Sequence, residues 1–393
     1  MFSRVALNPA RRLNGFGTSI FTEMTRLAVQ HRAINLGQGF PDFPAPDFIK
    51  EAAARAIAAD QNQYAPAPGV PRLRRAIAEH FQRRHGHAAD PDTEVTIAGG
   101  ATEILFDAIL AFLDPGDEAI VFEPFYDAYV PDIQMAGGTA RVVTLRPPHW
   151  RFDPDELRAA FGPRTRLLVL NTPHNPTGKV FDTAELDLIA ELCRAHDVLA
   201  ISDEVYSELV YPGAQHVPLA TRPGMWDRTI TVDSIGKTFS VTGWKIGWAI
   251  AAPPLTAALR GVHQFVTFAN ATPFQEAAAD AITEAATSGY YDRLRADYAA
   301  RRALLTSILH GCGLQTLPVQ GAYFLLADIA GLPFPDDTAF CRHLISQVGV
   351  AAIPPSAFYA DPATAPRLAR FCFAKRDETM RAAAERLAAM KKP

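Results

Sequence analysis

Cysteine is scarce in this sequence, and its four residues are scattered. Cys193, Cys312, Cys341 and Cys372 have no cysteine close by in the chain, so the sequence predicts neither a disulfide framework nor a zinc knuckle. No group of histidine and carboxylate residues has the spacing of a metal site either, and no metal is expected. Buried or incidental thiols in a reducing compartment are the expected state of the cysteines.

Two kinds of partner are also not expected. The 38 lysine and arginine residues are spread along a chain whose formal net charge is -4, which gives no electrostatic footprint for DNA or RNA. No apolar run is long enough to span a bilayer. Residues 1–30 carry Arg4, Arg11 and Arg12 but lack the apolar centre of a signal peptide. The cytoplasm is therefore the expected location, with neither nucleic acid nor membrane as a partner.

What is present is the composition of an ordinary globular protein, with 48% hydrophobic and 20% charged residues. At 393 residues the chain exceeds the ~250–300 residues at which single cores stop growing, so two domains are expected. Between about residues 94 and 252, short apolar runs alternate with helical patterns, which predicts a mainly parallel sheet covered by helices. The predicted strands are Val95–Ala98, Ala119–Phe122, Leu167–Leu170, Val198–Ser202 and Thr229–Val232. Asp182 and Glu185 are spaced as a capping box at the start of one helix.

The C-terminal part has a different pattern, typical of a smaller α+β domain. Long helical patterns cover Tyr291–Leu309, Asp337–Val348 and Glu378–Met390, and strand-like runs cover Tyr323–Ala327 and Leu368–Phe373. Prolines interrupt residues 40–46, which favours an arm or connection there. The predicted division is 1–46 for the N-terminal arm and part of the small domain, 47–280 for the large domain, and 281–393 for the C-terminal small domain.

The strongest chemical signal directly follows the last predicted strand of the large domain. The segment SIGKTFS, residues 234–240, contains Lys237, and TGWKIGW, residues 242–248, contains Lys245. A lysine in a confined pocket at a strand end can have its pKa lowered, which exposes the free amine that forms an imine with an aldehyde cofactor. Taken alone, a pair of surface lysines is the commoner explanation.

Two further polar segments, NTPHNPTG at 171–178 and ISDEVY at 201–206, each follow a predicted buried strand. Loops at the carboxyl ends of strands in an open α/β sheet converge on one crevice, so we expect Asn175, Asp203, Tyr206 and Lys237 to meet there. Glu204 is expected to be a structural partner instead, because neighbours on a strand point to opposite faces.

With these residues in view, the chain resembles the class I, fold-type I aminotransferases, which use pyridoxal 5'-phosphate (PLP). In detail it is similar to the branch that includes kynurenine, glutamine and bacterial methionine aminotransferases. Further segments carry the likeness nearly end to end: NLGQGFPDF at 35–43, NQY at 62–64, GGATE at 99–103 and RFCF at 370–373. The resemblance implies an α/β fold with a large domain built on a mainly parallel seven-stranded sheet, a smaller α+β domain, and amino acid and 2-oxo acid substrates.

The resemblance also implies roles for the residues expected in the crevice. Lys237 would hold PLP as a Schiff base and then move a proton between the substrate and the cofactor, as base and acid in turn. Asp203 would pair with the protonated pyridine nitrogen and keep the ring an electron sink. Tyr206 and Asn175 would donate hydrogen bonds to the ring oxygen, and Tyr126 would stack on the ring face.

The cofactor phosphate needs hydrogen-bond donors and positive charge. Ala101 and Thr102 begin a predicted helix after Gly99-Gly100, where free N–H groups favour an anion. Ser234 and Lys245 would add a hydroxyl and a cation. Tyr64 resembles the tyrosine that reaches the phosphate from a neighbouring subunit, which implies a homodimer with shared active sites.

The substrate is expected to bind through its α-carboxylate to Arg370, helped by Asn175 and the backbone at Gly39. Between Arg260 and Arg293 there is no lysine or arginine, and residues 263–270 resemble a neutral pocket-lining segment of this branch. A neutral amino donor is therefore predicted. Phe21, where the kynurenine and glutamine enzymes tend to carry tryptophan, and the pair Thr102-Glu103 favour the methionine type. Kynurenine, glutamine or an aromatic amino acid is the nearest alternative.

Other activities stay open on the sequence alone. The same apparatus could eliminate a leaving group from cysteine conjugates, as a β-lyase. Aminotransferase-like domains also serve as PLP-sensing binding modules in transcription regulators, but those carry an added DNA-binding domain. A structural pseudoenzyme is disfavoured because every expected cofactor contact is present.

Overall fold

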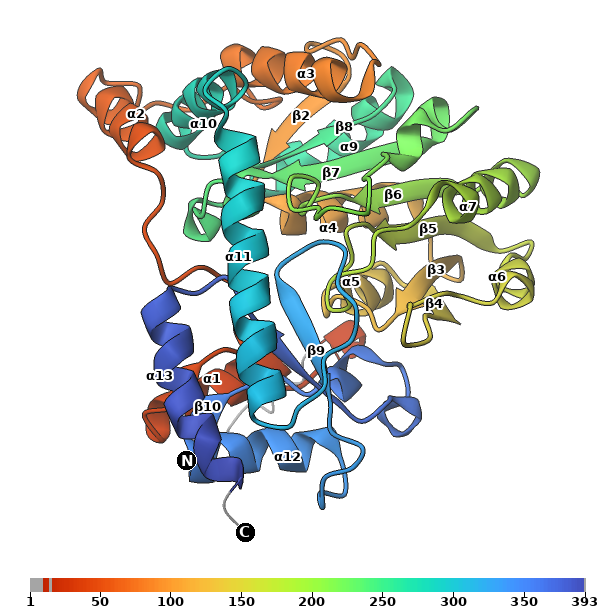
Figure 1. Ribbon diagram of the computed structural model, residues 1–393. Helices are drawn as coiled ribbons and strands as arrows, with labels where there is room; N and C mark the ends of the chain where they lie inside the picture. The colour runs from red at the N-terminus through yellow and green to blue at the C-terminus, as the bar shows by residue number, and fades with distance from the viewer. Residues whose placement is uncertain (1–9, 14–15, 392–393) are drawn as a thin grey trace, which may run out of the picture.

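A seven-stranded sheet forms the core of the larger part of the molecule in the computed structural model, which describes residues 10–13 and 16–391 (Figure 1). The strand order is β2-β8-β7-β6-β5-β3-β4, and neighbours are parallel except that β8 runs antiparallel to β2 and β7. The strands are β2 (Val95–Ala98), β3 (Glu118–Glu123), β4 (Thr139–Thr144), β5 (Thr165–Asn171), β6 (Leu199–Asp203), β7 (Thr229–Ser234) and β8 (Gly247–Ile250).

The expected α/β class and mainly parallel sheet are confirmed, and all five predicted strands are present. Two strands were missed. β4 lies at the edge of the sheet and is only partly buried, so it lacks a continuous apolar run. β8 is four residues long and begins with glycine, which gives a weak strand signal.

Helices cover both faces of this sheet because its strands are apolar on both sides. Along β3, Val121 packs in one core cluster with α4, α5 and α9, whereas Phe122 packs in another with α6 and α7. A third cluster joins α2, α3 and α10 beside β2. These helices are α2 (Asp47–Ala58), α3 (Pro71–His85), α4 (Ala101–Phe112), α5 (Tyr129–Met135), α6 (Pro154–Ala160), α7 (Thr183–Ala195), α8 (Ile235–Thr238), α9 (Pro253–Val266) and α10 (Thr272–Ala285).

The predicted capping box at the start of α7 is confirmed. The Asp182 side chain accepts a hydrogen bond from the Glu185 N–H, and the Glu185 carboxylate accepts one from the Asp182 N–H. Two otherwise unpaired N–H groups at the helix start are satisfied in this way.

The smaller part of the molecule lies at the far end of the long helix α11 (Figure 1). It has an antiparallel pair, β9 with β11, and a short parallel pair, β1 with β10. The predicted helices and strands of the C-terminal part are all present, with shifted ends. The elements are α1 (Ile20–Gln30), β1 (Ile34–Asn35), α11 (Tyr290–Gly311), β9 (Phe324–Asp328), α12 (Asp337–His343), β10 (Val350–Ala351), β11 (Leu368–Cys372) and α13 (Asp377–Leu387).

A separate core cluster occupies this smaller part. It joins α1 residues such as Met24 to C-terminal residues such as Phe371, so both ends of the chain contribute to one core. This arrangement supports the division at 46/47 and 280/281, which we retain as a proposal; residues 1–9 of the arm lie outside the described residues. Within the described ranges, none of the helices has the length and apolar character needed to cross a membrane.

Candidate active site

A cavity of ≈ 270 Å³ opens where the carboxyl ends of the sheet strands meet the smaller part of the molecule. Loops after β2, β3, β5, β6 and β7 line it from one side. Phe21 of α1, residues 38–40 after β1, Phe324 of β9 and Arg370 of β11 line it from the other. The convergence expected from an open α/β sheet therefore occurs. Twelve predicted site residues line the cavity: Phe21, Gly39, Ala101, Thr102, Tyr126, Asn175, Asp203, Tyr206, Ser234, Lys237, Lys245 and Arg370.

One end of the cavity is suited to an anion. Gly100 precedes α4 with φ 82° and no side-chain cap, so the first N–H groups of α4 point outward without a capping side chain. The Lys245 ammonium lies 3.4 Å from the Thr102 hydroxyl beside this turn. Gly247 is required here, because a Cβ at that position would lie 2.5 Å from the Ala101 backbone nitrogen.

At another wall, Asp203 is a buried carboxylate at the end of β6. The Tyr129 hydroxyl donates a hydrogen bond of 2.6 Å to it, and the Val205 N–H donates a longer one of 3.4 Å. Burial raises the pKa of Asp203 to about 6, and the hydrogen bond from Tyr129 opposes that rise. A cation placed against this carboxylate would favour its charged form.

Lys237 projects into the cavity from the short helix α8, directly after β7. Its ammonium lies 5.9 Å from the ring centres of both Tyr206 and Tyr323. Burial lowers the pKa of Lys237 to about 8, although the nearby Asp203 charge acts in the opposite direction. A much larger fraction of free amine is therefore present near neutral pH than for an ordinary lysine, as nucleophilic attack on an aldehyde requires.

Arg370 is a buried arginine at the centre of β11. Its guanidinium donates hydrogen bonds of 2.9 Å to the Asn175 side-chain oxygen and to the Gly37 carbonyl oxygen. It lies over the ring of Phe324 at 4.2 Å and near that of Phe21 at 5.1 Å. Its Nε atom has no hydrogen-bond partner among the described residues. A buried cation whose hydrogen bonds to described residues go to neutral oxygens can pair with a carboxylate.

Two predictions involve residues outside this cavity. Tyr64 is 85% exposed and contacts Phe268 edge to face, with ring centres 5.7 Å apart. The segment 263–270, which resembles a pocket-lining segment of this branch, does not line the cavity of its own chain. Its residue Phe265 is 86% exposed instead. In this chain the wall facing Arg370 comes instead from aromatic residues such as Phe21 and Phe324.

Sequence analysis also missed residues that support the site. Tyr129 holds Asp203, and the Asn171 side chain links the Asp203 carbonyl oxygen to the Asn175 N–H. Tyr323 contacts the ring of Tyr206 and donates a hydrogen bond to the Gly39 carbonyl oxygen. Asn171 was visible as the first residue of its polar segment, but Tyr129 and Tyr323 carry no local signal.

Glu204 follows the last residue of β6 and does not line the cavity, in line with the expectation that it is a structural partner. Its carboxylate accepts a hydrogen bond of 2.8 Å from the Ser202 hydroxyl and lies 2.8 Å from the His216 ring. His174 is buried 2.8 Å from the Thr177 hydroxyl, and burial lowers its pKa to about 3. Both side chains therefore have structural partners.

Comparison with known proteins identifies the family. The family model for class I and II aminotransferases matches residues 31–387. The chain belongs to this family. The aminotransferase is 44% identical over 381 residues to the methionine aminotransferase of Escherichia coli K12, covering 97% of this chain and 98% of the relative. A solved E. coli structure described as revealing a methionine aminotransferase function has a TM-score of 0.93 and 43% identity, covering 98% of this chain and 100% of that one.

Other relatives of the aminotransferase carry different names. The human kynurenine--oxoglutarate transaminase 1 is 40% identical over 409 residues, which cover 96% of this chain and 97% of the relative. A Mycobacterium tuberculosis H37Rv protein described as a probable N-succinyldiaminopimelate aminotransferase is 45% identical over 391 residues, with 96% and 98% covered. The fold-type I architecture expected from the sequence is thus confirmed. The relatives are named for different amino acid substrates.

Enzymes of this family depend on PLP, and the cavity of the aminotransferase fits that cofactor. The anion-binding turn at Gly100 is suited to the phosphate. The Asp203 carboxylate is suited to a protonated ring nitrogen, and the Lys237 amine to the aldehyde. These three groups line one cavity, so a single cofactor molecule can engage all of them.

Proposed function

We propose that this aminotransferase moves the amino group of a neutral L-amino acid, with methionine as first choice, to a 2-oxo acid. The observation that carries the proposal is which positively charged side chains line the cavity. Within the described residues, its lining lysines and arginines are Lys237, Lys245 and Arg370. The first two serve the cofactor, so Arg370 alone is left for the substrate, and it matches an α-carboxylate.

The cofactor, when bound, supplies an aldehyde that takes up the amino group and a ring that accepts electrons released at the substrate α-carbon. In our proposal the Lys237 amine holds the proton removed from that carbon and returns it to the other reacting atom. Asp203 keeps a positive charge on the ring nitrogen. Tyr126 covers the ring face, and Ser234, Thr102 and Lys245 bind the phosphate together with the N–H groups of Ala101 and Thr102.

Asn175 has a double task in this proposal. Its side-chain oxygen accepts a hydrogen bond from Arg370, which leaves its amide N–H groups free to donate. We assign those N–H groups, with the Tyr206 hydroxyl, to the ring oxygen of the cofactor. Asn175 thereby links the carboxylate-binding arginine to the cofactor, and the backbone at Gly39 closes the same corner of the cavity.

The preference for a neutral side chain follows from the remaining walls. Phe21, Phe40 and Phe324 are aromatic, and they gain roughly 25 cal/mol per Å² of apolar substrate surface that they cover. A distal carboxylate would lose its hydration without finding a second cation there. Because one methylene changes binding in such a pocket by only ~1–3 kcal/mol, broad specificity is expected.

Steady-state rates with methionine, glutamine, kynurenine, phenylalanine and aspartate test this proposal. We expect the highest kcat/KM with methionine and the lowest with aspartate. The amine made by decarboxylating methionine, which lacks the α-carboxylate, is the matched control and should be turned over poorly because it leaves Arg370 unpaired. Fastest turnover of aspartate would contradict the neutral pocket.

We further propose a homodimer in which Tyr64 reaches the cofactor phosphate of the partner subunit. The exposed aromatic side chains of Tyr64, Phe265 and Phe268 support it, because such side chains are costly to leave in water and are typical of interfaces. An interface at this place would also bring the segment 263–270 to the partner's cavity.

Sedimentation and subunit mixing test the dimer. The purified holoenzyme should sediment as a dimer at assay concentration. Mixing inactive Lys237→Ala chains with chains carrying Tyr64→Ala should yield heterodimers with one site that contains both Lys237 and Tyr64, and that site should have the wild-type PLP affinity. A monomer of full activity would overturn this proposal.

We retain the cytoplasm as the proposed location. Cys193, Cys341 and Cys372 are buried free thiols, as is usual in a reducing compartment. Fractionation of the native host cells would check it, and recovery of the enzyme outside the cytoplasm would contradict it.

A further inference from the structure

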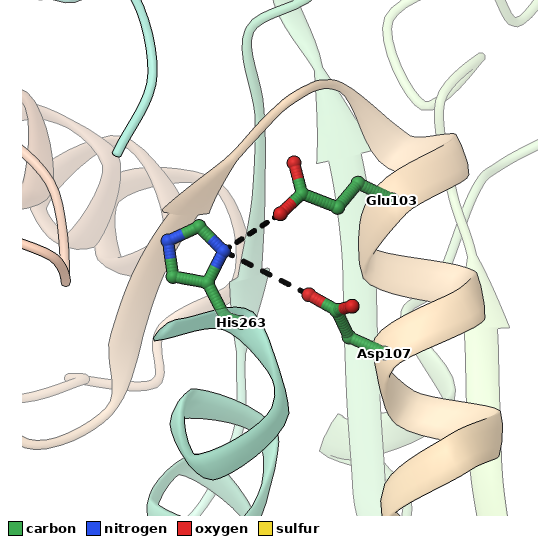
Figure 2. Close-up of side chains that lie close together, drawn as sticks. All are labelled: Glu103, Asp107 and His263. Atoms are coloured by element: carbon green, nitrogen blue, oxygen red, sulfur yellow. Dashed lines mark hydrogen bonds and ion pairs between the residues drawn. The ribbon is translucent and has the colours of Figure 1, made fainter. Parts of the chain in front are cut away.

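A cluster of three titratable side chains lies behind the phosphate-binding turn, outside the cavity. Glu103 and Asp107 project from the same side of α4, and His263 faces them from α9 (Figure 2). One donor atom from each of the three lies within 4.8 Å of the other two. None of these three side chains is assigned above to the cofactor or to the substrate carboxylate.

The hydrogen bonding of His263 leaves one ring nitrogen facing a carboxylate. Its Nε2 atom lies 3.0 Å from the Ala67 carbonyl oxygen, which can only accept, so Nε2 carries a hydrogen. In the neutral ring Nδ1 is then a bare lone pair, and it lies 2.7 Å from a Glu103 oxygen. Two acceptors at this distance require a hydrogen or a metal ion between them: either a proton, on the ring or on Glu103, or a metal ion.

Asp107 distinguishes these two possibilities. It is fully buried, and neither of its carboxylate oxygens has a hydrogen-bond partner among the described residues. The nearer oxygen lies 3.7 Å from His263 Nδ1 and points toward it (Figure 2). A ring proton bound to Glu103 would satisfy His263 but would leave Asp107 unpaired, at a substantial desolvation cost.

The charges point in the same direction. Glu103 and Asp107 are four residues apart on one helix, where like charges repel. With both carboxylates ionised, a protonated His263 would leave one net negative charge buried in the cluster, whereas a divalent cation with a neutral His263 gives a total of zero.

We propose that Glu103, Asp107 and His263 form a binding site for one divalent transition-metal ion. Two carboxylates and an imidazole are ligands that Zn²⁺ accepts at about 2.0–2.2 Å, with water in a fourth position. The hydrogen bond from His263 Nε2–H to a backbone carbonyl is the outer-shell contact that orients metal-binding histidines. Sequence analysis expected no metal, because α9 and α4 are far apart in the chain.

The site would act on the turn that precedes α4. Glu103 accepts a hydrogen bond from the Gly99 N–H, so the ion would be connected through one carboxylate to the Gly99-Gly100 turn. The expected role is structural, since none of the three ligands lines the active-site cavity.

Zinc binding to the holoenzyme tests the proposal. A chelator removes metal from the purified enzyme and is then itself removed. Calorimetry measures the binding of added Zn²⁺, elemental analysis measures the zinc content per chain, and the melting temperature is recorded at each Zn²⁺ concentration. The variants are Asp107→Asn, which removes a charge at nearly constant shape, and His263→Asn, which keeps an amide donor toward Glu103 but loses the ring nitrogen. Asp114→Asn, an exposed carboxylate two residues beyond α4, is the matched control.

We expect one Zn²⁺ per chain in the wild type and in Asp114→Asn, with a melting temperature that rises with Zn²⁺ concentration. Asp107→Asn and His263→Asn should each bind Zn²⁺ about 100-fold more weakly or worse, because losing even an outer-shell partner of a metal ligand weakens binding by up to about 100-fold. Their melting temperatures should not change with Zn²⁺ concentration. Binding of equal strength in all four proteins, no binding in the wild type, or a loss in only one ligand variant would overturn the site. If either ligand variant fails to fold, absence of zinc stabilisation in the wild type still overturns it. The measurement does not depend on turnover, so it is independent of the proposed reaction.

Discussion

Lys237→Ala is expected to lower kcat for transamination by roughly 100- to 10,000-fold or more, the range in which a positioned acid–base group contributes. The loss has two causes, because this amine both attaches the cofactor and carries the proton. Its surroundings suit both roles: the side chain is half-buried in the cavity that Asp203 also lines, and the removal from solvent lowers the pKa of Lys237 to about 8. Initial rates with methionine and a 2-oxo acid, at saturating PLP, measure the effect.

Lys50→Ala is the matched control for that experiment. Lys50 is a half-exposed lysine on α2 that pairs with Asp47 at the surface, and its removal should leave kcat unchanged. A Lys237→Ala enzyme that turned over at the wild-type rate would remove the basis of the proposed chemistry.

Asp203→Asn is expected to lower kcat by roughly 100- to 1,000-fold, the scale on which a single preorganised electrostatic contact acts. The substitution keeps the shape of the side chain and an oxygen for the Tyr129 hydroxyl, so its effect isolates the charge facing the ring nitrogen. Initial rates at a series of pH values provide the measurement, and wild-type kcat in Asp203→Asn would contradict the assignment.

Tyr129→Phe is the companion variant, because it removes the 2.6 Å hydrogen bond but leaves the carboxylate in place. That hydrogen bond opposes the rise of the Asp203 pKa caused by burial, so its loss moves the pKa upward. The carboxylate is then protonated at higher pH than in the wild type. We therefore expect a smaller loss of kcat than in Asp203→Asn, and a loss that grows as the pH falls until the carboxylate is protonated in the wild type as well.

Much of the fold was predictable because its signals are local. The strands β2, β3, β5, β6 and β7 are largely buried on both faces, and their apolar and β-branched residues stand out as short runs. The start of α7 was marked by its capping residues. The edge strand β4 could not be found in this way, since partial burial leaves no apolar run and its pairing with β3 is set by tertiary structure.

The residues of the candidate site likewise fall into those with a local sequence signal and those without one. Asn175, Asp203 and Lys237 follow predicted strands, so the topology of a parallel sheet brings them together. Arg370 was assigned to the substrate by resemblance alone. The assignment stays a prediction, and it is supported by the position of this buried guanidinium over Phe324 and near Phe21, with an Nε atom that has no partner among the described residues.

Contacts between distant segments remained out of reach of sequence patterns. Tyr129 touches Asp203 across 74 residues of chain, and His263 touches Glu103 across 160. Neither pair follows from spacing or periodicity, because each depends on how a helix is docked on the sheet. The zinc site that we propose was missed for this reason.

The most direct test is to reduce the native holoenzyme with borohydride, digest it, and locate the pyridoxyl group by mass spectrometry. We predict one modified residue per chain, at Lys237, and no such label when the enzyme is first saturated with methionine, which displaces the lysine from the cofactor. A label at Lys245 or another lysine, or no label at all, would contradict the claim that Lys237 is the residue bonded to PLP.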